Sequence, residues 1–109
     1  MNVFDTLQRL RECGIVAIVR GTSADVLGNV LTALRNGGVR AVEVTLDTPG
    51  ACSMIERLAQ DYGDSMLVGA GTVLDPETAR AAILAGATFV LSPTLNPKVI
   101  QMCRRYGVL

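Results

Sequence analysis

The chain has 109 residues, of which 50% are hydrophobic and 4% aromatic, and its ten basic and ten acidic side chains cancel to a net charge of zero. This composition can bury a core, so residues 1–109 are predicted to form one domain. The neutral, aromatic-poor chain lacks the basic stacking surface that binds nucleic acid. No apolar run reaches the roughly 20 residues of a membrane helix, and the first residues carry charges where a signal peptide is apolar. We therefore expect a soluble, cytoplasmic protein that binds neither nucleic acid nor a membrane.

One unit recurs along the chain: a short apolar strand, a polar or glycine-bearing turn, an amphipathic helix and a closing glycine. An amphipathic N-terminal helix precedes the first unit. Apolar runs predict four strands, at residues 15–19, 41–45, 68–72 and 88–91. Four polar residues, three of them followed at once by proline, are predicted to cap the helices after these strands: Ser23, Thr48, Asp75 and Asn96.

The spacing of these strands, about 20 to 26 residues, suits βαβ units, which build either a closed (β/α)8 barrel or an open doubly wound sheet. The first strand is not followed by the Gly-x-Gly-x-x-Gly turn of a dinucleotide-binding fold, which favours the barrel. A TIM barrel takes about 250 residues. The predicted fold class is therefore α/β, of the (β/α)8 TIM-barrel family. The chain would supply the N-terminal helix and about four βα units, a half-barrel truncated at its C-terminus.

The three cysteines, Cys13, Cys52 and Cys103, are odd in number and far apart, so they are predicted to be free and mostly buried thiols. None of their spacings is that of a metal site, and the chain has no histidine, the commonest metal ligand and general base. We therefore expect no bound metal. Any catalysis has to use Glu, Asp, Lys, Cys or Tyr.

A glutamate interrupts the apolar strand at 41–45. Side chains alternate along a strand, so Glu43 lies on the face opposite Val42 and Val44, whose side chains suit the helix-covered side. Glu43 is thus predicted to point into the barrel. Burial without a partner raises a carboxyl pKa, as a general acid or base at neutral pH requires. The alternative is a structural ion pair with Arg20, at the end of the neighbouring strand.

Polar or glycine-bearing groups lie at or just beyond the ends of the predicted strands, where barrel enzymes place their sites. The candidates at this rim are Arg20, Thr45, Asp47, Gly71, Thr72, Ser92 and Pro93. The segment Gly69-Ala70-Gly71 lets backbone amides approach a ligand, although such a sequence also forms ordinary tight turns. The loop at Ser92-Pro93 either lines a site or only turns the chain.

Four motifs, in order and spacing over essentially the whole chain, resemble the N-terminal half of the KDPG/KHG aldolases: Ile18-Val19-Arg20, Glu43-Val44-Thr45-Leu46, Gly69-Ala70-Gly71-Thr72-Val73-Leu74 and Leu91-Ser92-Pro93. The resemblance implies a class I lyase that splits 2-keto-3-deoxy-6-phosphogluconate or 4-hydroxy-2-oxoglutarate through a lysine Schiff base. The products would be pyruvate and an aldehyde, glyceraldehyde 3-phosphate or glyoxylate. The resemblance also implies a (β/α)8 homotrimer that uses no metal or organic cofactor.

The same resemblance implies roles for residues of this chain. Glu43 would be the acid–base catalyst. The substrate-binding residues would be Arg20, Thr45, Gly71, Thr72, Ser92 and Pro93. Among these, Arg20 and Thr72 would hold the substrate carboxylate, for which a guanidinium is the natural partner. Some members of the family carry that arginine at the position of Asp47, so this chain departs from one version of the pattern.

The family's Schiff-base lysine lies on the sixth strand, beyond Leu109. Lys98, the only lysine in this chain, is predicted to be solvated, because a nucleophilic lysine has to be desolvated or crowded by another cation. The chain alone is therefore expected to be inactive. Two alternatives stay open. One is a non-catalytic half-barrel that self-associates through unpaired strand edges, and the other is a different phosphate-handling barrel enzyme, such as a phosphate synthase or an epimerase.

Overall fold

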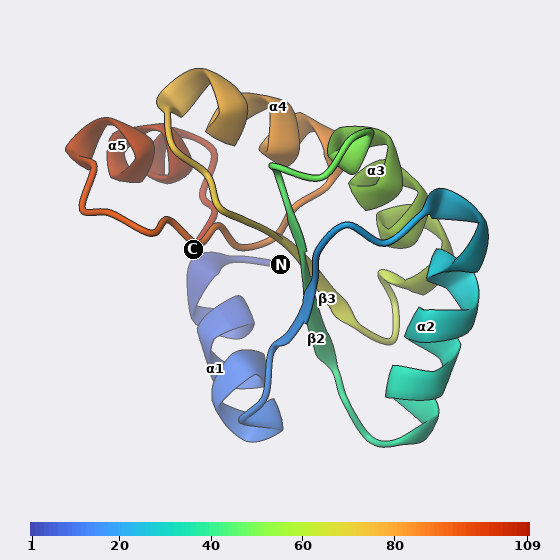
Figure 1. Ribbon diagram of the computed structural model, residues 1–109. Helices are drawn as coiled ribbons and strands as arrows, with labels where there is room; N and C mark the ends of the chain where they lie inside the picture. The colour runs from blue at the N-terminus through green and yellow to red at the C-terminus, as the bar shows by residue number, and fades with distance from the viewer.

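The computed structural model describes residues 1–109 as an α/β fold with three parallel strands and five helices (Figure 1). In chain order the elements are α1 (Val3–Cys13), β1 (Ala17–Val19), α2 (Ala24–Asn36), β2 (Ala41–Thr45), α3 (Ala51–Tyr62), β3 (Leu67–Gly71), α4 (Pro76–Ala85) and α5 (Pro97–Arg105). The strands lie in the order β1, β2, β3, and both neighbouring pairs are parallel. No helix combines the length and the apolar character that a membrane span requires.

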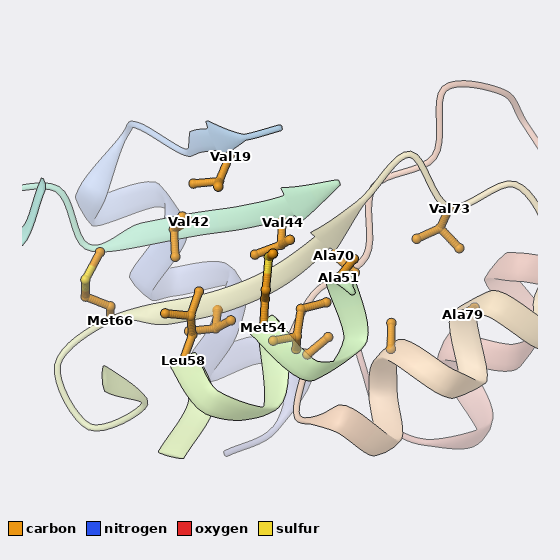
Figure 2. Close-up of a cluster of buried hydrophobic side chains, with 14 of the residues drawn as sticks. Val19, Val42, Val44, Ala51, Met54, Leu58, Met66, Ala70, Val73 and Ala79 are labelled. Atoms are coloured by element: carbon orange, nitrogen blue, oxygen red, sulfur yellow. The ribbon is translucent and has the colours of Figure 1, made fainter. Parts of the chain in front are cut away.

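Helices cover one face of the sheet, and α1 packs against the other face only near the start of the strands. Residues of α2, α3, α4 and α5 form the main core with one face, and α1 packs on the other, around a smaller cluster that contains Ala41 (Figure 1). Val42 and Val44 are completely buried in the main core, and Val44 points toward Met54 of α3 (Figure 2). The prediction that these valines face the helices is confirmed. Alternation then leaves Glu43 on the opposite face.

β1 is shorter than predicted, because residues 15 and 16 lie outside it. Its partner strand begins only at Ala41. The residue before, Arg40, donates its N–H to the Cys13 sulfur, 3.3 Å away, instead of to a neighbouring strand. Ile15, which lies opposite Arg40 in the register of β1 and β2, therefore has no ladder to join.

The prediction of a fourth strand at 88–91 is wrong, because only Val90 of this segment forms a β-bridge, with Ala70 of β3. Two backbone hydrogen bonds through Ala70, of 3.0 and 2.8 Å, still hold the segment beside β3. On its other side the Val90 N–H donates to the Leu109 carbonyl at 2.8 Å. The ladder stops because Pro93, which has no N–H, follows almost at once.

Three of the four predicted N-caps are correct, and two of them make side-chain capping hydrogen bonds. The Asp75 carboxylate accepts hydrogen bonds from the Thr78 backbone N–H and hydroxyl, which lower the Asp75 pKa. The Asn96 side chain accepts from the Lys98 N–H at 3.1 Å. In both helices proline occupies the first turn, where its missing N–H has no partner to lose.

The prediction that Thr48 caps the third helix is wrong. α3 begins at Ala51, and its N-cap is Gly50, whose φ of 73° is left-handed and favours glycine. Backbone hydrogen bonds from Thr48 to Thr45 and from Ala51 to Thr48 form a tight turn ahead of the helix. That turn takes Thr48 out of capping position. Ser23 is the N-cap of α2 as predicted, although its side chain makes no capping hydrogen bond.

The interior of α2 contains a glycine that contributes no packing. A Cβ added at Gly28 would meet only the Tyr62 hydroxyl, at 3.8 Å, an ordinary contact. Gly28→Ala is therefore expected to raise the free energy of unfolding by about 0.4–1 kcal/mol, because alanine restricts the unfolded chain more than glycine does. Denaturant unfolding followed by circular dichroism measures this change, and a loss of stability would contradict the packing described for α2.

Candidate active site

Glu43 stands at the centre of β2 with 5% of its surface exposed. Its Oε2 atom is buried and has no hydrogen-bond partner. Burial raises the pKa of Glu43 above the ordinary value of 4.5, and the positive charge of Arg20 offsets only part of that rise. The predicted direction of the pKa shift is confirmed. The carboxyl group keeps its proton to a higher pH than a solvated glutamate, as an acid–base catalyst requires.

Two glycines of β3 make room for neighbouring side chains, and one of these side chains is Glu43. Gly71 lies beside Glu43, and a Cβ at Gly71 would fall on the Glu43 carboxyl group. Gly69 is the direct strand partner of Glu43, and its open side is filled by the Phe89 ring. The structure thus shows a packing reason for both glycines. Gly71 thus lies directly beside the Glu43 carboxyl group.

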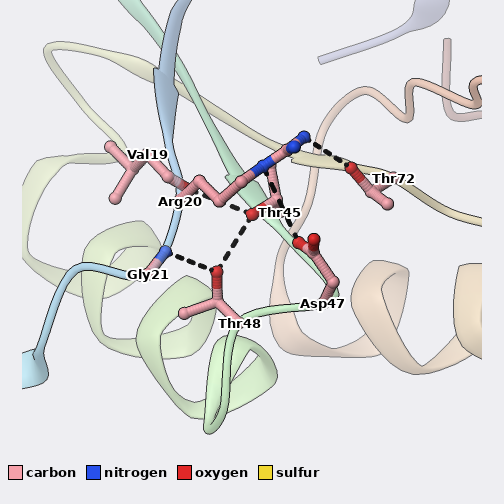
Figure 3. Close-up of polar contacts among 7 residues, drawn as sticks. All are labelled: Val19, Arg20, Gly21, Thr45, Asp47, Thr48 and Thr72. Atoms are coloured by element: carbon pink, nitrogen blue, oxygen red, sulfur yellow. Dashed lines mark hydrogen bonds and ion pairs between the residues drawn. The ribbon is translucent and has the colours of Figure 1, made fainter.

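Arg20 follows β1 and reaches across the end of the sheet to the loops after β2 and β3 (Figure 3). Its Nη2 donates to the Thr72 hydroxyl at 3.1 Å, and its Nε lies 3.9 Å from Oδ1 of Asp47. The Arg20 and Asp47 side chains are 60% and 50% exposed, so this ion pair is weak and Arg20 stays available to an anion. The ion pairs of the structure do not include Arg20 with Glu43, which overturns the alternative of a structural pair.

Thr72 is the one non-glycine residue with a positive φ, 55°. A β-branched side chain rarely adopts this conformation, and such strain is concentrated at binding and catalytic sites. Thr72 directly follows β3 and holds its hydroxyl toward the Arg20 guanidinium (Figure 3). The backbone strain and the hydrogen bond together single out this residue at the rim.

Thr45 is completely buried, and its hydroxyl is engaged inside the protein. It donates to the Val19 carbonyl at 3.4 Å and lies 2.9 Å from the Thr48 hydroxyl. Thr48 was not predicted as a site residue. One feature of the sequence could have pointed to Thr48. It lies three residues after Thr45, at the end of β2, and a turn there brings the two hydroxyl groups together.

Ser92 and Pro93 are exposed in the loop after Val90. The Ser92 hydroxyl donates to the Val73 carbonyl at 2.7 Å, which ties this loop to the one after β3. That second loop carries Thr72. The structure therefore gathers Arg20 and Thr72 at one rim and anchors the Ser92-Pro93 loop to the neighbouring part of that rim.

Other reactive side chains lie outside this arrangement. Lys98 is exposed at the start of α5, which confirms the prediction of a solvated lysine. The cysteines are free, but only Cys103 is buried, where burial raises the pKa of its thiol; Cys13 and Cys52 are half-buried, contrary to expectation. No group of three or more cysteine or acidic side chains is placed to hold a metal ion.

The buried carboxyl group of Glu43, with its raised pKa, and Arg20 at the carboxyl ends of the parallel strands together form a candidate site of the kind that α/β enzymes carry there. A family model described as KDPG and KHG aldolase matches residues 6–108. The chain belongs to this aldolase family.

Its relatives are similar along most of the chain. A 2-dehydro-3-deoxy-phosphogluconate aldolase of Treponema pallidum is 41% identical over 99% of this chain and 50% of its own length. A solved structure described as native KDPGal is 34% identical with a TM-score of 0.82, covering 85% of this chain and 45% of the other. A KDPG aldolase from Legionella pneumophila, solved with pyruvate captured as a covalent carbinolamine intermediate, is 29% identical with a TM-score of 0.79 and the same coverages. The chain spans about half the length of the curated relatives it matches.

Proposed function

We propose that this chain is the acid–base half of a class I aldolase whose single barrel domain is completed by a second half. The enzyme would cleave 2-keto-3-deoxy-6-phosphogluconate or 4-hydroxy-2-oxoglutarate to pyruvate and glyceraldehyde 3-phosphate or glyoxylate. The observation that carries the proposal is the buried Glu43 carboxyl group, unpartnered at Oε2 and with a raised pKa. The carbinolamine of pyruvate in the Legionella relative supports the same chemistry.

In this mechanism a lysine outside residues 1–109 attacks the C2 carbonyl of the substrate and forms a carbinolamine. Glu43, protonated, gives its proton to the departing hydroxyl, so that water leaves and an iminium forms. The resulting carboxylate takes the proton of the C4 hydroxyl as the C3–C4 bond breaks and its electrons flow into the iminium. Proton return to C3 and hydrolysis then release pyruvate and regenerate the lysine.

Arg20 and Thr72 would hold the substrate carboxylate at the rim. The guanidinium already donates to Thr72 and is exposed, so it can take a carboxylate without breaking a buried pair. Asp47 competes for the same guanidinium, and it stands where some aldolases carry an arginine. Gly71, Ser92 and Pro93 would line the same substrate site, and Thr45 would support it from below. We further propose a cytoplasmic homotrimer that needs no metal or organic cofactor.

Borohydride trapping tests the proposal. The chain is produced alone and as the protein that its coding DNA specifies past codon 109, and each is incubated with pyruvate and borohydride. The extended protein is expected to gain the mass of one reduced pyruvate adduct at a lysine, whereas the chain alone, with its solvated Lys98, is expected to gain none. A folded extended protein that forms no adduct would favour another phosphate-handling barrel enzyme. A stop codon at 110 with a well-folded oligomer would favour the self-associating half-barrel.

A further inference from the structure

The main chain on both sides of Arg20 is held by buried hydroxyl groups. The residue before it, Val19, accepts a hydrogen bond from the Thr45 hydroxyl at 3.4 Å, and the residue after it, Gly21, donates its N–H to the Thr48 hydroxyl at 3.0 Å. The two hydroxyls lie 2.9 Å apart (Figure 3). Thr45 and Thr48 are 0% and 5% exposed, so water does not compete for these groups.

The donor and acceptor in each of these three hydrogen bonds follow from the number of protons that the two hydroxyl groups carry. A hydroxyl has one proton to donate and two lone pairs that accept. Thr45 spends its proton on the Val19 carbonyl, so the proton between the two hydroxyls has to come from Thr48. Thr48 in turn accepts from the Gly21 N–H. The result is one directed chain from the Gly21 N–H through both hydroxyls to the Val19 carbonyl.

The side chain of Arg20 has much weaker restraints of its own. Its contacts are one hydrogen bond to Thr72 and a 3.9 Å ion pair with the half-exposed Asp47. Solvent screens such a pair, and a long side chain loses entropy when it is held by it. The position of the Arg20 backbone, from which the side chain extends, is therefore set by the hydrogen bonds of Val19 and Gly21. The contacts of the guanidinium with Thr72 and Asp47 are too weak to set it.

We propose that Thr48 is a positioning residue, which acts through Gly21 and Thr45 to fix the backbone of Arg20 so that the guanidinium meets the substrate carboxylate. This inference rests on the proposed role of Arg20 as the carboxylate-binding residue. Thr48 does not cap α3, whose N-cap is Gly50, so its hydroxyl has no helix-capping duty that would explain its burial. Thr45 then contributes to substrate binding indirectly, because its own hydroxyl faces Val19 and Thr48.

The test uses the 109-residue chain, with nuclear magnetic resonance of the Arg20 Nε group and the Gly21 amide and with pyruvate as the probe. Thr48→Val keeps the shape and removes the hydroxyl. It is expected to make the Gly21 amide exchange faster, lower the order parameter of Arg20 Nε, and weaken pyruvate binding at Arg20 by about five- to tenfold. Thr48→Ser is expected to restore all three. The matched control is Thr32→Val, which removes a hydroxyl that bonds Tyr62 away from the site and should leave Arg20 unchanged.

The possible outcomes separate the two proposals. If Thr48→Val leaves Arg20 Nε and pyruvate binding as they were, while Arg20→Ala weakens that binding, the positioning role is wrong and the carboxylate role stands. If Arg20→Ala leaves pyruvate binding unchanged, the carboxylate role is wrong, and a loss of Arg20 order in Thr48→Val would support only the backbone anchor. Should Thr48→Val not fold, the unaltered chain decides, because an unprotected Gly21 amide there would overturn the inference.

Discussion

Glu43→Gln is expected to lower the turnover of the complete aldolase by about 10²–10⁴-fold, the range that a positioned general acid or base contributes. Glutamine has nearly the same shape, but it has no proton to exchange at any step of the proposed mechanism. The same substitution should make the 109-residue chain more stable at neutral pH, by about 1–3 kcal/mol, because it replaces a carboxylate with a neutral amide. The Oε2 atom of that carboxylate is buried without a hydrogen-bond partner, and the Arg20 charge offsets only part of the cost of burying it. Opposite effects on activity and stability are the expected signature of a functional residue in an unfavourable environment.

The pH dependence of stability provides a second readout of the same group. The native pKa of Glu43 lies above its unfolded value, so the native state binds more protons between the two values. The contribution of Glu43 to stability is therefore fully present below about pH 4.5 and is lost as the pH rises through the raised native pKa. Glu43→Gln should remove this loss.

Urea unfolding at several pH values measures both effects in the chain, and initial rates of pyruvate release measure turnover in the complete protein. Glu56→Gln is the matched control, since Glu56 lies exposed on α3 and should change neither stability nor rate. Unaltered turnover in Glu43→Gln would rule out the acid–base role. Unaltered pH dependence would mean that the carboxyl group is ionised at no cost in the native state.

Gly71→Ala is expected to destabilise the chain by about 1–3 kcal/mol and to displace the Glu43 carboxyl group. The added methyl group would occupy the space of that carboxyl group, and β3 cannot move away from β2 without loss of the ladder between them. A displaced carboxyl group loses the burial that raises its pKa. In the complete enzyme, turnover should therefore fall along with stability.

A double-mutant cycle with Glu43→Ala isolates this contact. In the Glu43→Ala background, Gly71→Ala should lower the free energy of unfolding by at least about 0.5 kcal/mol less than it does in the unaltered chain, because residues 43 and 71 are in contact. Gly28→Ala is the control for the intrinsic effect of replacing glycine, since its Cβ would meet only the Tyr62 hydroxyl, at the ordinary contact distance of 3.8 Å. An additive cycle would show that the destabilisation arises elsewhere in β3.

Local signals predicted much of this structure. The alternation of side chains along β2 placed Val42 and Val44 against the helices and Glu43 on the other face. Asp75 and Asn96 were recognised as caps because a cap interacts only with residues two or three positions away. Such interactions are set by local backbone geometry, which the order of residues specifies directly.

Signals that depended on partners far along the chain were misleading or silent. Thr48 looked like a helix cap, yet its hydroxyl bonds Gly21, which is 27 positions away. Arg20 was weighed as the partner of Glu43, but it bonds Thr72 and pairs with Asp47. In each case several residues of suitable chemistry were available, and the register between strands selected one of them.

The sequence by itself determined the α/β unit, the main-core faces of the strands, three helix N-caps and the burial of a carboxyl group in the middle of β2, because each of these follows from a short period or a neighbouring side chain. Only the tertiary structure decided where β1 begins, that residues 88–91 form a single bridge, and that two buried threonines hold the backbone of Arg20. Those features require distant segments to meet at one edge of the sheet. Their energies depend on strand register and burial, which no local pattern of residues encodes.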